Sequence, residues 1–381
     1  MIYFDNAATT KPLNSALEFA SKFNKDSFYN PSALYQNGIE NLKAVKDTKS
    51  LVLRTLGLSP NDYEVIFTSC GSESDNQAIF CSVKKGLFVT SLGEHSAVYK
   101  SFNELKNRGN NVYFCTLNKD GSVNLDDLFN FIKNNPVNFV SIVHVNNETG
   151  AINDVSFIAD TIKKINPKII FHADGVQAYG KIPFVFSKNI DFYSISAHKI
   201  NALKGTGVLI KKKKTNLTPL IFGGGQENGF RSGTENIFGI KTFEYSAKYH
   251  YENINEFTIK VKELNCYVRN NLNKDIFEII SSENASPYIL SVSAKGLRGE
   301  VIMHSLESLG IIVGNGSACS SKSRFSRVIE ACGYSNDVLD GVVRISFSQE
   351  NTMEETVILV EKLNEIAIKL KGIMKVWKTL L

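Results

Sequence analysis

The sequence predicts an α/β protein with a large domain, built on a mainly parallel sheet flanked by helices, and a smaller α+β domain. Between residues 63 and 210, short runs rich in β-branched residues alternate with longer amphipathic segments. This alternation is typical of a parallel sheet that carries helices on both faces. The chain has 381 residues, more than one hydrophobic core usually supports. We therefore expect a large domain over residues 15–250 and a small domain formed by residues 1–14 and 251–381.

The individual strands and helices follow from local hydrophobic patterns. Strands are expected at residues 1–4, 63–68, 87–90, 137–145, 169–172, 192–195, 287–293 and 342–347. Helices are expected at residues 156–165, 235–252 and 352–371. After about residue 235, long helices replace the strand–helix alternation. We take this change as the approach to the small domain, and we expect the N-terminal segment to join it.

Composition excludes several classes of protein. The hydrophobic fraction of 43% and the charged fraction of 21% are ordinary for a soluble globular protein. The formal net charge is only +5, and the main lysine run, at residues 211–214, is typical of a solvated strand end. No apolar run of about 18 residues and no signal-peptide pattern occurs, and the six cysteines show no CxxC pair or zinc spacing. We expect a cytoplasmic protein with reduced thiols, no metal site, no membrane span and no nucleic-acid partner.

A lysine that follows the strand at residues 192–195 is the first candidate for chemistry. A lysine at a strand end is usually a solvated surface charge. Beside Lys199, however, Ser196 and His198 add two groups that can bind a phosphate. Ligands of parallel sheets bind at the carboxyl ends of strands. Burial beside a cofactor there lowers the pKa of a lysine, so that its amine can form a Schiff base with pyridoxal phosphate.

An aspartate and a glutamine after the strand at residues 169–172 form a second cluster. An aspartate at a strand end is commonly a helix N-cap, which is the alternative to a functional role for Asp174. A pyridoxal enzyme needs a carboxylate beside the ring nitrogen, because the protonated ring withdraws electrons more strongly. Asp174 fits this requirement. Gln177, one turn later, can donate to the phenolate oxygen of the ring.

Two further clusters follow earlier strands. Residues 68–76 run from a strand through Gly71 and Ser72 into a helix, and backbone N–H groups at a helix N-terminus bind anions such as phosphate. An ordinary capped helix is the alternative there. His95 follows the strand at residues 87–90. A single histidine is more often structural, but at a strand end His95 can stack on a planar ring.

Seven segments, in the same order along the chain, resemble the NifS/IscS-like cysteine desulfurases of the class V aminotransferase group. These segments are residues 5–10, 94–95, 144–150, 172–177, 196–199, 223–234 and 316–321. The group consists of fold type I pyridoxal-phosphate enzymes, and the resemblance covers nearly the whole chain. It implies that Lys199 carries the cofactor as a Schiff base and that Asp174 contacts the pyridinium nitrogen. It also implies that Gln177 contacts the phenolate oxygen and that His95 lies over the ring.

The resemblance further implies the residues that bind the phosphate and the substrate. The implied phosphate-binding residues are Gly71, Ser72, Ser196 and His198, with Thr234 reaching across from the second subunit of a homodimer. The residues implied to bind the α-carboxylate of L-cysteine are Asn147 and Arg344. A guanidinium group suits that bidentate task, although an arginine on a strand is more often a surface charge.

Cys319 separates this group from true aminotransferases. A free cysteine is usually a small buried hydrophobe, but Cys319 lies among glycines and serines between residues 314 and 323. Such a composition is expected of a mobile, exposed loop. The resemblance implies that the Cys319 thiolate takes sulfur from L-cysteine as a persulfide, with Lys199 moving the α-proton and His95 as a proton partner. Alanine is the second product, and the sulfur would pass to an acceptor such as an iron–sulfur scaffold protein or to tRNA thiolation.

Three positions depart from the family pattern. Tyr35 stands where relatives usually carry a histidine, and Ser72 replaces the more usual threonine. Both changes leave the chemistry intact. The basic segment at residues 322–326 lacks the usual leucine and proline, which bears on the choice of sulfur acceptor. A selenocysteine lyase and a class V aminotransferase of the same fold are the alternative functions, and a non-catalytic scaffold is a third.

Overall fold

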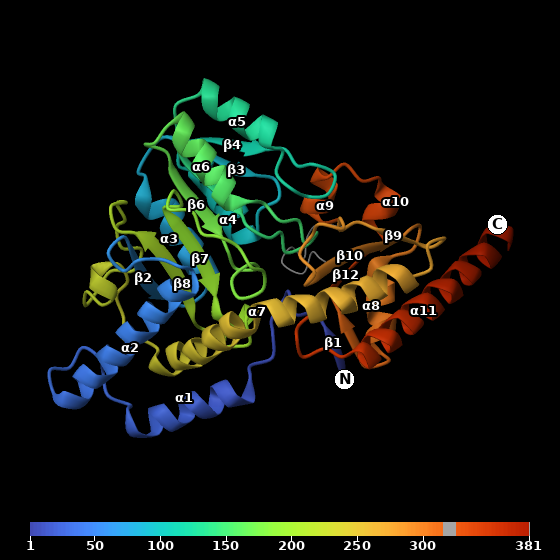
Figure 1. Ribbon diagram of the computed structural model, residues 1–381. Helices are drawn as coiled ribbons and strands as arrows, with labels where there is room; N and C mark the ends of the chain where they lie inside the picture. The colour runs from blue at the N-terminus through green and yellow to red at the C-terminus, as the bar shows by residue number, and fades with distance from the viewer. Residues whose placement is uncertain (315–324, 381) are drawn as a thin grey trace.

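A computed structural model describes residues 1–314 and 325–380 (Figure 1). Its largest sheet has seven strands in the order β2-β8-β7-β6-β5-β3-β4. These strands are β2 (Tyr63–Thr68), β3 (Leu87–Ser91), β4 (Asn111–Cys115), β5 (Val137–Val143), β6 (Ile170–Asp174), β7 (Phe192–Ser196) and β8 (Gly207–Lys212). The strands from β7 to β4 in this order run parallel to one another, whereas β8 is antiparallel to both β7 and β2. The carboxyl ends of β5, β6 and β7 therefore meet at one edge of the sheet.

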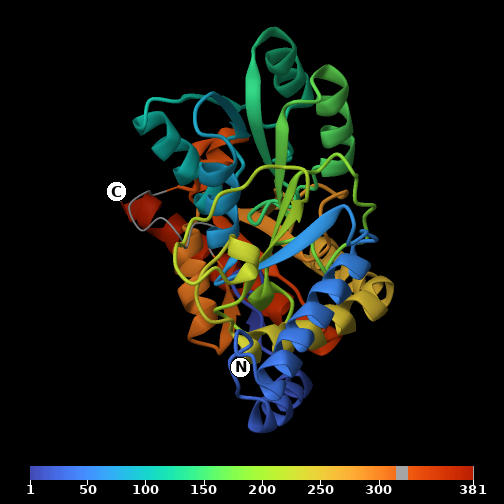
Figure 2. The same ribbon diagram turned by 90° about the vertical axis from the view of Figure 1, so that its left-hand side faces the viewer.

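Helices cover both faces of this sheet (Figure 2). The helices that belong with it are α1 (Asn14–Asp26), α2 (Gln36–Thr55), α3 (Gly71–Ser82), α4 (Ser96–Asn107), α5 (Leu125–Asn134) and α6 (Val155–Ile165). On one face, Ile79 of α3 and Phe102 of α4 pack against the buried strand residues Phe88 and Phe139. On the other face, α2, α5 and α6 contribute apolar side chains to the largest core cluster. Both faces are thus buried, which explains the nearly continuous apolar character of the central strands.

A second, smaller core lies beside the first and contains two small sheets (Figure 1). The antiparallel sheet has the order β12-β10-β9, and β1 pairs in parallel with β11. The elements here are β1 (Ile2–Phe4), β9 (Phe277–Ile279), β10 (Ile289–Ala294), α8 (Gly299–Glu307), β11 (Ile311–Val313), α9 (Arg327–Ala331), α10 (Asn336–Leu339), β12 (Val342–Ser346) and α11 (Met353–Leu380). Next to β1, the side-chain amide of Asn6 donates to the carbonyl of Ser346 at 3.0 Å. The first residues of the chain therefore pack against nearly the last strand.

One long helix, α7 (Ile237–Asn271), belongs to both cores. Phe243 packs in the first core, and Leu264 packs in the second. The helix is longer than the predicted segment 235–252, because no proline interrupts it and its only glycine, Gly239, lies in the first turn. The predicted boundary near residue 250 falls inside this helix, so the division into two domains stays a prediction.

The predicted fold class is confirmed. Every strand expected from the sequence is present to within about two residues at each end, and the helix expected at residues 156–165 is α6. The short strands β4, β9 and β11 were not predicted individually. Among the helices of the described residues, none combines the length and the apolar character that crossing a bilayer requires.

A close approach between β7 and the turn after β6 has a consequence for stability. Gly175 follows Asp174 directly, and a Cβ atom at position 175 would lie 2.0 Å from Cζ of Tyr193. Tyr193 is fully buried, and its hydroxyl bonds to Nδ1 of His144 at 2.9 Å. The tyrosine ring therefore has no room to move away, and only glycine fits at position 175.

We expect Gly175→Ala to lower the free energy of unfolding by about 1–3 kcal/mol, because overpacked cores are strained by about that amount. Urea denaturation of the purified variant measures this change. The matched control is Gly372→Ala on α11, where a Cβ atom would meet nothing within 4 Å. That substitution should stabilise the protein by ~0.5–1 kcal/mol, because alanine favours helix more than glycine does. Equal effects of the two substitutions would contradict the packing argument.

Candidate active site

A cavity of about 820 Å³ lies at the carboxyl ends of β5, β6 and β7. Val143, Asp174 and Ser196, the last residues of these three strands, line it, and Ala7 and Arg344 close it from the side of the second core. The structure brings ten of the twelve predicted site residues together in this cavity. They are Gly71, Ser72, His95, Asn147, Asp174, Gln177, Ser196, His198, Lys199 and Arg344.

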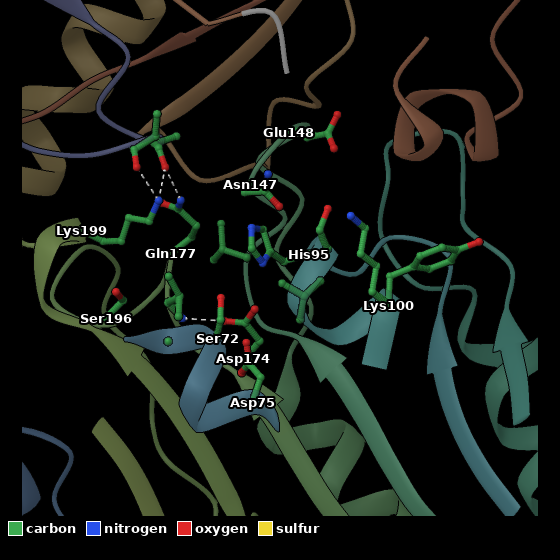
Figure 3. Close-up of a pocket in the computed structure, with 18 of the residues that line it drawn as sticks. Ser72, Asp75, His95, Lys100, Asn147, Glu148, Asp174, Gln177, Ser196 and Lys199 are labelled. Carbon is green, nitrogen blue, oxygen red and sulfur yellow. Dashed lines mark hydrogen bonds between the residues drawn. The ribbon is translucent and has the colours of Figure 1, made fainter. Parts of the chain in front are cut away.

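Lys199 is positioned by a single 3₁₀ turn, η1 (Ala197–Lys199), that directly follows β7. Its Nζ donates to the carbonyl oxygens of Ala7 and Ala8, both at 2.7 Å (Figure 3). The lysine amine therefore lies inside the cavity, and the N-terminal segment holds it there.

Asp174 ends β6 and is buried below the cavity. Its Oδ1 accepts the backbone N–H of Val176 at 2.9 Å. This is the kind of local cap that was the alternative to a functional role, and it occupies only one of the two carboxylate oxygens. In the described part of the chain, Oδ2 makes no hydrogen bond. Burial raises the pKa of Asp174 to about 6, even though the nearby Lys199 lowers it. A positively charged group beside Oδ2 would offset the cost of burying this carboxylate.

A second carboxyl group, Asp75 of α3, lies behind Asp174 and also lines the cavity (Figure 3). Asp75 is 1% exposed, and its Oδ1 has no hydrogen-bond partner among the described residues. Burial, followed by the charge of Asp174, raises its pKa well above the usual range. Asp75 was not among the site residues predicted from the sequence. It could have been recognised as a charged residue at a position of the predicted helix whose side chain should face the sheet.

His95 is the N-cap residue of α4, and its Nδ1 accepts the backbone N–H of Ala97 at 3.2 Å. Burial, together with the charges of Lys199 and Arg327, lowers the pKa of His95 to about 4. The ring is therefore neutral at pH 7, and because Nδ1 accepts, Nε2 carries the proton. His95 therefore has a structural role as the N-cap of α4. It also presents a neutral ring with one N–H donor to the cavity.

The N-terminus of α3 forms a cradle for an anion. Its N-cap residue, Cys70, makes no side-chain cap, so the first N–H groups of the helix are open to a ligand. Ser196 contributes a hydroxyl that is buried and has no hydrogen-bond partner among the described residues. A Cβ atom at Gly71 would lie 2.7 Å from Cγ2 of Val176 and 3.3 Å from Cβ of Ser196, so a side chain would fill this space. These features fit a phosphate group bound at this end of the cavity.

Arg344 of β12 forms the opposite end. Its Nη1 donates to the carbonyl of Asn147 at 2.9 Å, and its Nη2 pairs with Oδ1 of Asp5 at 2.8 Å. The Nε atom is buried and has no partner in the described part of the chain. These two bonds hold the guanidinium in place and leave its Nε–H without a partner among the described residues, which suits a carboxylate ligand. Asp5, which orients Arg344, was quoted in the sequence analysis only as part of a resembling segment.

The two remaining predicted residues are Thr234 and Cys319. Thr234 is exposed and lies outside the cavity. Cys319 lies outside the described residues. The described residues on either side of segment 315–324 do lie at the cavity. A Cβ atom at Gly314 would come within 3.0 Å of Nη2 of Arg344, and Ser326 is one of the lining residues.

The chain is similar to known proteins over nearly its whole length. Residues 2–359 match the family model described as aminotransferase class-V. The chain is 36% identical over 379 residues to a NifS/IcsS protein homolog of Lactobacillus delbrueckii subsp. bulgaricus, covering 96% of this chain and 97% of the relative. It is 33% identical over 392 residues to a cysteine desulfurase of Nostoc sp., covering 98% and 94% of the two chains. A solved NifS-like protein superposes with a TM-score of 0.89 at 32% identity, covering 96% and 98%.

The cavity holds a partly buried lysine, a buried carboxylate, an open helix N-terminus and a fixed guanidinium. The chain belongs to the class V aminotransferase family. Within that family, it is similar over nearly its whole length to NifS/IscS-like cysteine desulfurases.

Glu94 gives the site a dependence on pH. It is completely buried, its Oε1 accepts from Ser91 Oγ at 2.7 Å and from the N–H of Val143 at 3.1 Å, and its Oε2 has no partner among the described residues. Burial raises the pKa of Glu94 to about 8. In the unfolded chain a glutamate titrates near ~4.3. The folded state therefore holds a proton that the unfolded state releases, and stability contributed by Glu94 is lost as the pH rises from about 4.3 to 8.

We expect Glu94→Gln to stabilise the protein relative to the wild type at pH 8 by ~2–4 kcal/mol, because glutamine has no proton to lose. At pH 4.5 the two proteins should differ little. Urea denaturation at both pH values, without added cofactor, measures the two differences. A gap between the proteins that is the same at both pH values would show that Glu94 is ionised in the folded protein.

Proposed function

We propose that this protein is a cysteine desulfurase that uses pyridoxal 5'-phosphate and transfers the sulfur of L-cysteine to Cys319. One observation carries the proposal: Lys199, Asp174, the α3 cradle and Arg344 line the same cavity. These groups match the aldehyde, the ring nitrogen and the phosphate of the cofactor and the carboxylate of an amino acid. The relatives named as cysteine desulfurases, at about a third identity over nearly full length, support this choice of reaction.

The cofactor, when bound, supplies an electron sink that activates bonds at the substrate's α- and β-carbons. The protein's part is to hold and orient it. The Asp174 carboxylate stays ionised beside a protonated ring nitrogen, because the two opposite charges offset each other's burial. Gln177 donates to the phenolate oxygen, and the neutral ring of His95 packs over the cofactor ring. The phosphate is bound by Gly71, Ser72, Ser196 and His198.

The proposed roles of Arg344 and Lys199 rest on this geometry, and that of Cys319 rests on the resemblance to cysteine desulfurases. Arg344 binds the α-carboxylate of L-cysteine through its free Nε–H. The Lys199 amine takes the α-proton. The Cys319 thiolate forms a bond to the substrate sulfur while the substrate's carbon–sulfur bond breaks, and the carbon takes up a proton. The products are L-alanine and a Cys319 persulfide, so no external oxidant or reductant is needed.

We further propose a homodimer in which Thr234 binds the phosphate of the other subunit's site. The segment that carries Thr234 is anchored on α3, because Arg231 Nε pairs with Glu73 Oε1 at 2.9 Å and Gln77 donates to the carbonyl of Phe230 at 2.7 Å. Thr234 itself is exposed, and so is the nearby apolar side chain of Phe222. A cytoplasmic location, and an iron–sulfur scaffold or tRNA thiolation as the destination of the sulfur, stay predictions.

Mass spectrometry of the intact protein after incubation with L-cysteine tests the reaction. We expect the mass of one added sulfur atom, located on Cys319 by peptide mapping and absent from Cys319→Ser. The control is Cys266→Ser, which removes an exposed cysteine on α7 and should leave the added sulfur in place. Full alanine production by Cys319→Ser would refute the persulfide step. Turnover that requires a keto acid would indicate an aminotransferase, and turnover of selenocysteine alone would indicate a selenocysteine lyase.

Complementation between two inactive variants tests the shared site. In a mixed dimer of Lys199→Ala and Thr234→Glu subunits, one of the two sites has both native residues, if Thr234 acts across the interface. After random mixing and subunit exchange, we therefore expect activity of about a quarter of the wild-type value, although each parent variant has little. The glutamate blocks the phosphate by charge repulsion. No gain of activity in dimers shown to have exchanged subunits would place Thr234 outside the partner's site.

A further inference from the structure

A second lysine lies buried next to the candidate cofactor site. Lys181 is 3% exposed, and its Nζ donates to Oε1 of Gln177 at 2.8 Å. No carboxylate pairs with it in the described part of the chain. The ring of Tyr288, with its centroid 5.9 Å from Nζ, is its other polarisable neighbour. Burial, with the positive charges of Lys199 and Arg344, lowers the pKa of Lys181 to about 7.

A lysine in this position costs stability, because an ammonium group is expensive to bury without a charged partner. A methionine of similar length would fill the same space without that cost. Lys211 shows the usual arrangement for a buried lysine in this protein: it is 2% exposed and pairs with Glu64 at 2.9 Å. Lys181 instead donates its hydrogen bond to the neutral side-chain amide of Gln177, so its effect on the site depends on the role of that amide.

The orientation of the Gln177 amide depends on its two neighbours. The Ala7 carbonyl can only accept a hydrogen bond, and Gln177 Nε2 donates to it at 2.8 Å (Figure 3). Oε1 must then point the other way, toward Lys181. Among the described residues, no other group donates to Oε1, so without Lys181 a buried acceptor is left unsatisfied and the amide is free to rotate. The second N–H of Nε2 makes no bond in the described part of the chain, and Gln177 lines the cavity.

This chain of bonds reaches the cofactor lysine. The Ala7 carbonyl that accepts from Gln177 also accepts from Lys199 Nζ at 2.7 Å. Lys181, Gln177, Ala7 and Lys199 are therefore linked in one row of hydrogen bonds. The charged and titratable groups around Lys199 are His95, Asp174, His198, Lys181 and Arg344.

We propose that Lys181 is a positioning residue that fixes the Gln177 amide with its N–H₂ group toward the cofactor's phenolate oxygen. In this way Lys181 sets the proton affinity of the nitrogen that joins Lys199 to the cofactor. The inference rests on the proposed function. A donor to the phenolate stabilises the form in which the nitrogen has lost its proton, because the oxygen then carries the full negative charge. Loss of that donor makes the nitrogen hold its proton to higher pH.

The test is a pH titration of the visible absorbance of the purified holoprotein. Lys181→Met should move the midpoint upward by about one pH unit, a tenfold change in proton affinity. Lys181→Arg, which keeps a donor, should move it by less than half of that. The matched control is Lys211→Met, which removes an equally buried lysine far from the cofactor and should leave the midpoint unchanged. This readout does not depend on turnover, and circular dichroism confirms that each variant is folded.

A double-mutant cycle shows whether Lys181 acts through Gln177. In a Gln177→Leu background, Lys181→Met should cause little further shift, because the amide that it orients is gone. An undiminished shift in that background, or an unchanged midpoint in Lys181→Met alone, overturns the inference and leaves the proposed function standing. A wild-type protein that shows no visible band with pyridoxal phosphate overturns the proposed function, and the inference falls with it.

Discussion

The burial of charged groups at the carboxyl ends of parallel strands is the constraint on which the rest of the site depends. The strands β5, β6 and β7 must end together for Asp174 and Lys199 to lie in one cavity, and the same packing buries Asp174 and leaves Lys199 partly buried. A buried charge is tolerated only when a partner or a bound ligand compensates it. Within the described residues, Asp174 and Ser196 each have an unused polar atom facing this region. A ligand of complementary charge and hydrogen-bonding capacity would compensate both atoms.

Most of this site was predictable from sequence, because the residues that bear the chemistry directly follow strands. Asp174, Ser196 and Lys199 are recognisable for this reason, and the strands themselves have clear apolar patterns. Asp75, Asp5 and Lys181 were not recognised. Each of these residues belongs to the site because it contacts a segment distant in sequence or because its buried side chain points toward the cavity. A local sequence pattern reveals neither property. The length of α7 was missed for a similar reason, since its exposed middle section separates two apolar faces that pack in different cores.

The two cores contribute different functions to one cavity. The large sheet supplies Asp174 and Ser196, which would face the proposed cofactor, whereas β12 supplies Arg344, which would bind the proposed amino-acid substrate. Arg327 of α9 connects the two sides, because its guanidinium donates to the carbonyls of Leu92 and Glu94 beside His95 and packs on the ring of Tyr99, 3.7 Å from the centroid. The shape of the cavity is thus set by contacts across the two cores as well as within either one.

The pairing of β1 with β11 has a consequence for the synthesis of the protein. Ala7 and Ala8, which hold Lys199, follow a strand whose partner is Ile311–Val313, and Asn6 bonds to Ser346. Ala7 and Ala8 must therefore wait for a strand that lies roughly 300 residues later in the chain. At typical rates of translation the interval is on the order of tens of seconds. During that time the parallel sheet can fold, but Lys199 lacks the carbonyls that hold its amine in place. Stable capture of a cofactor is thus a late event in the life of each new chain.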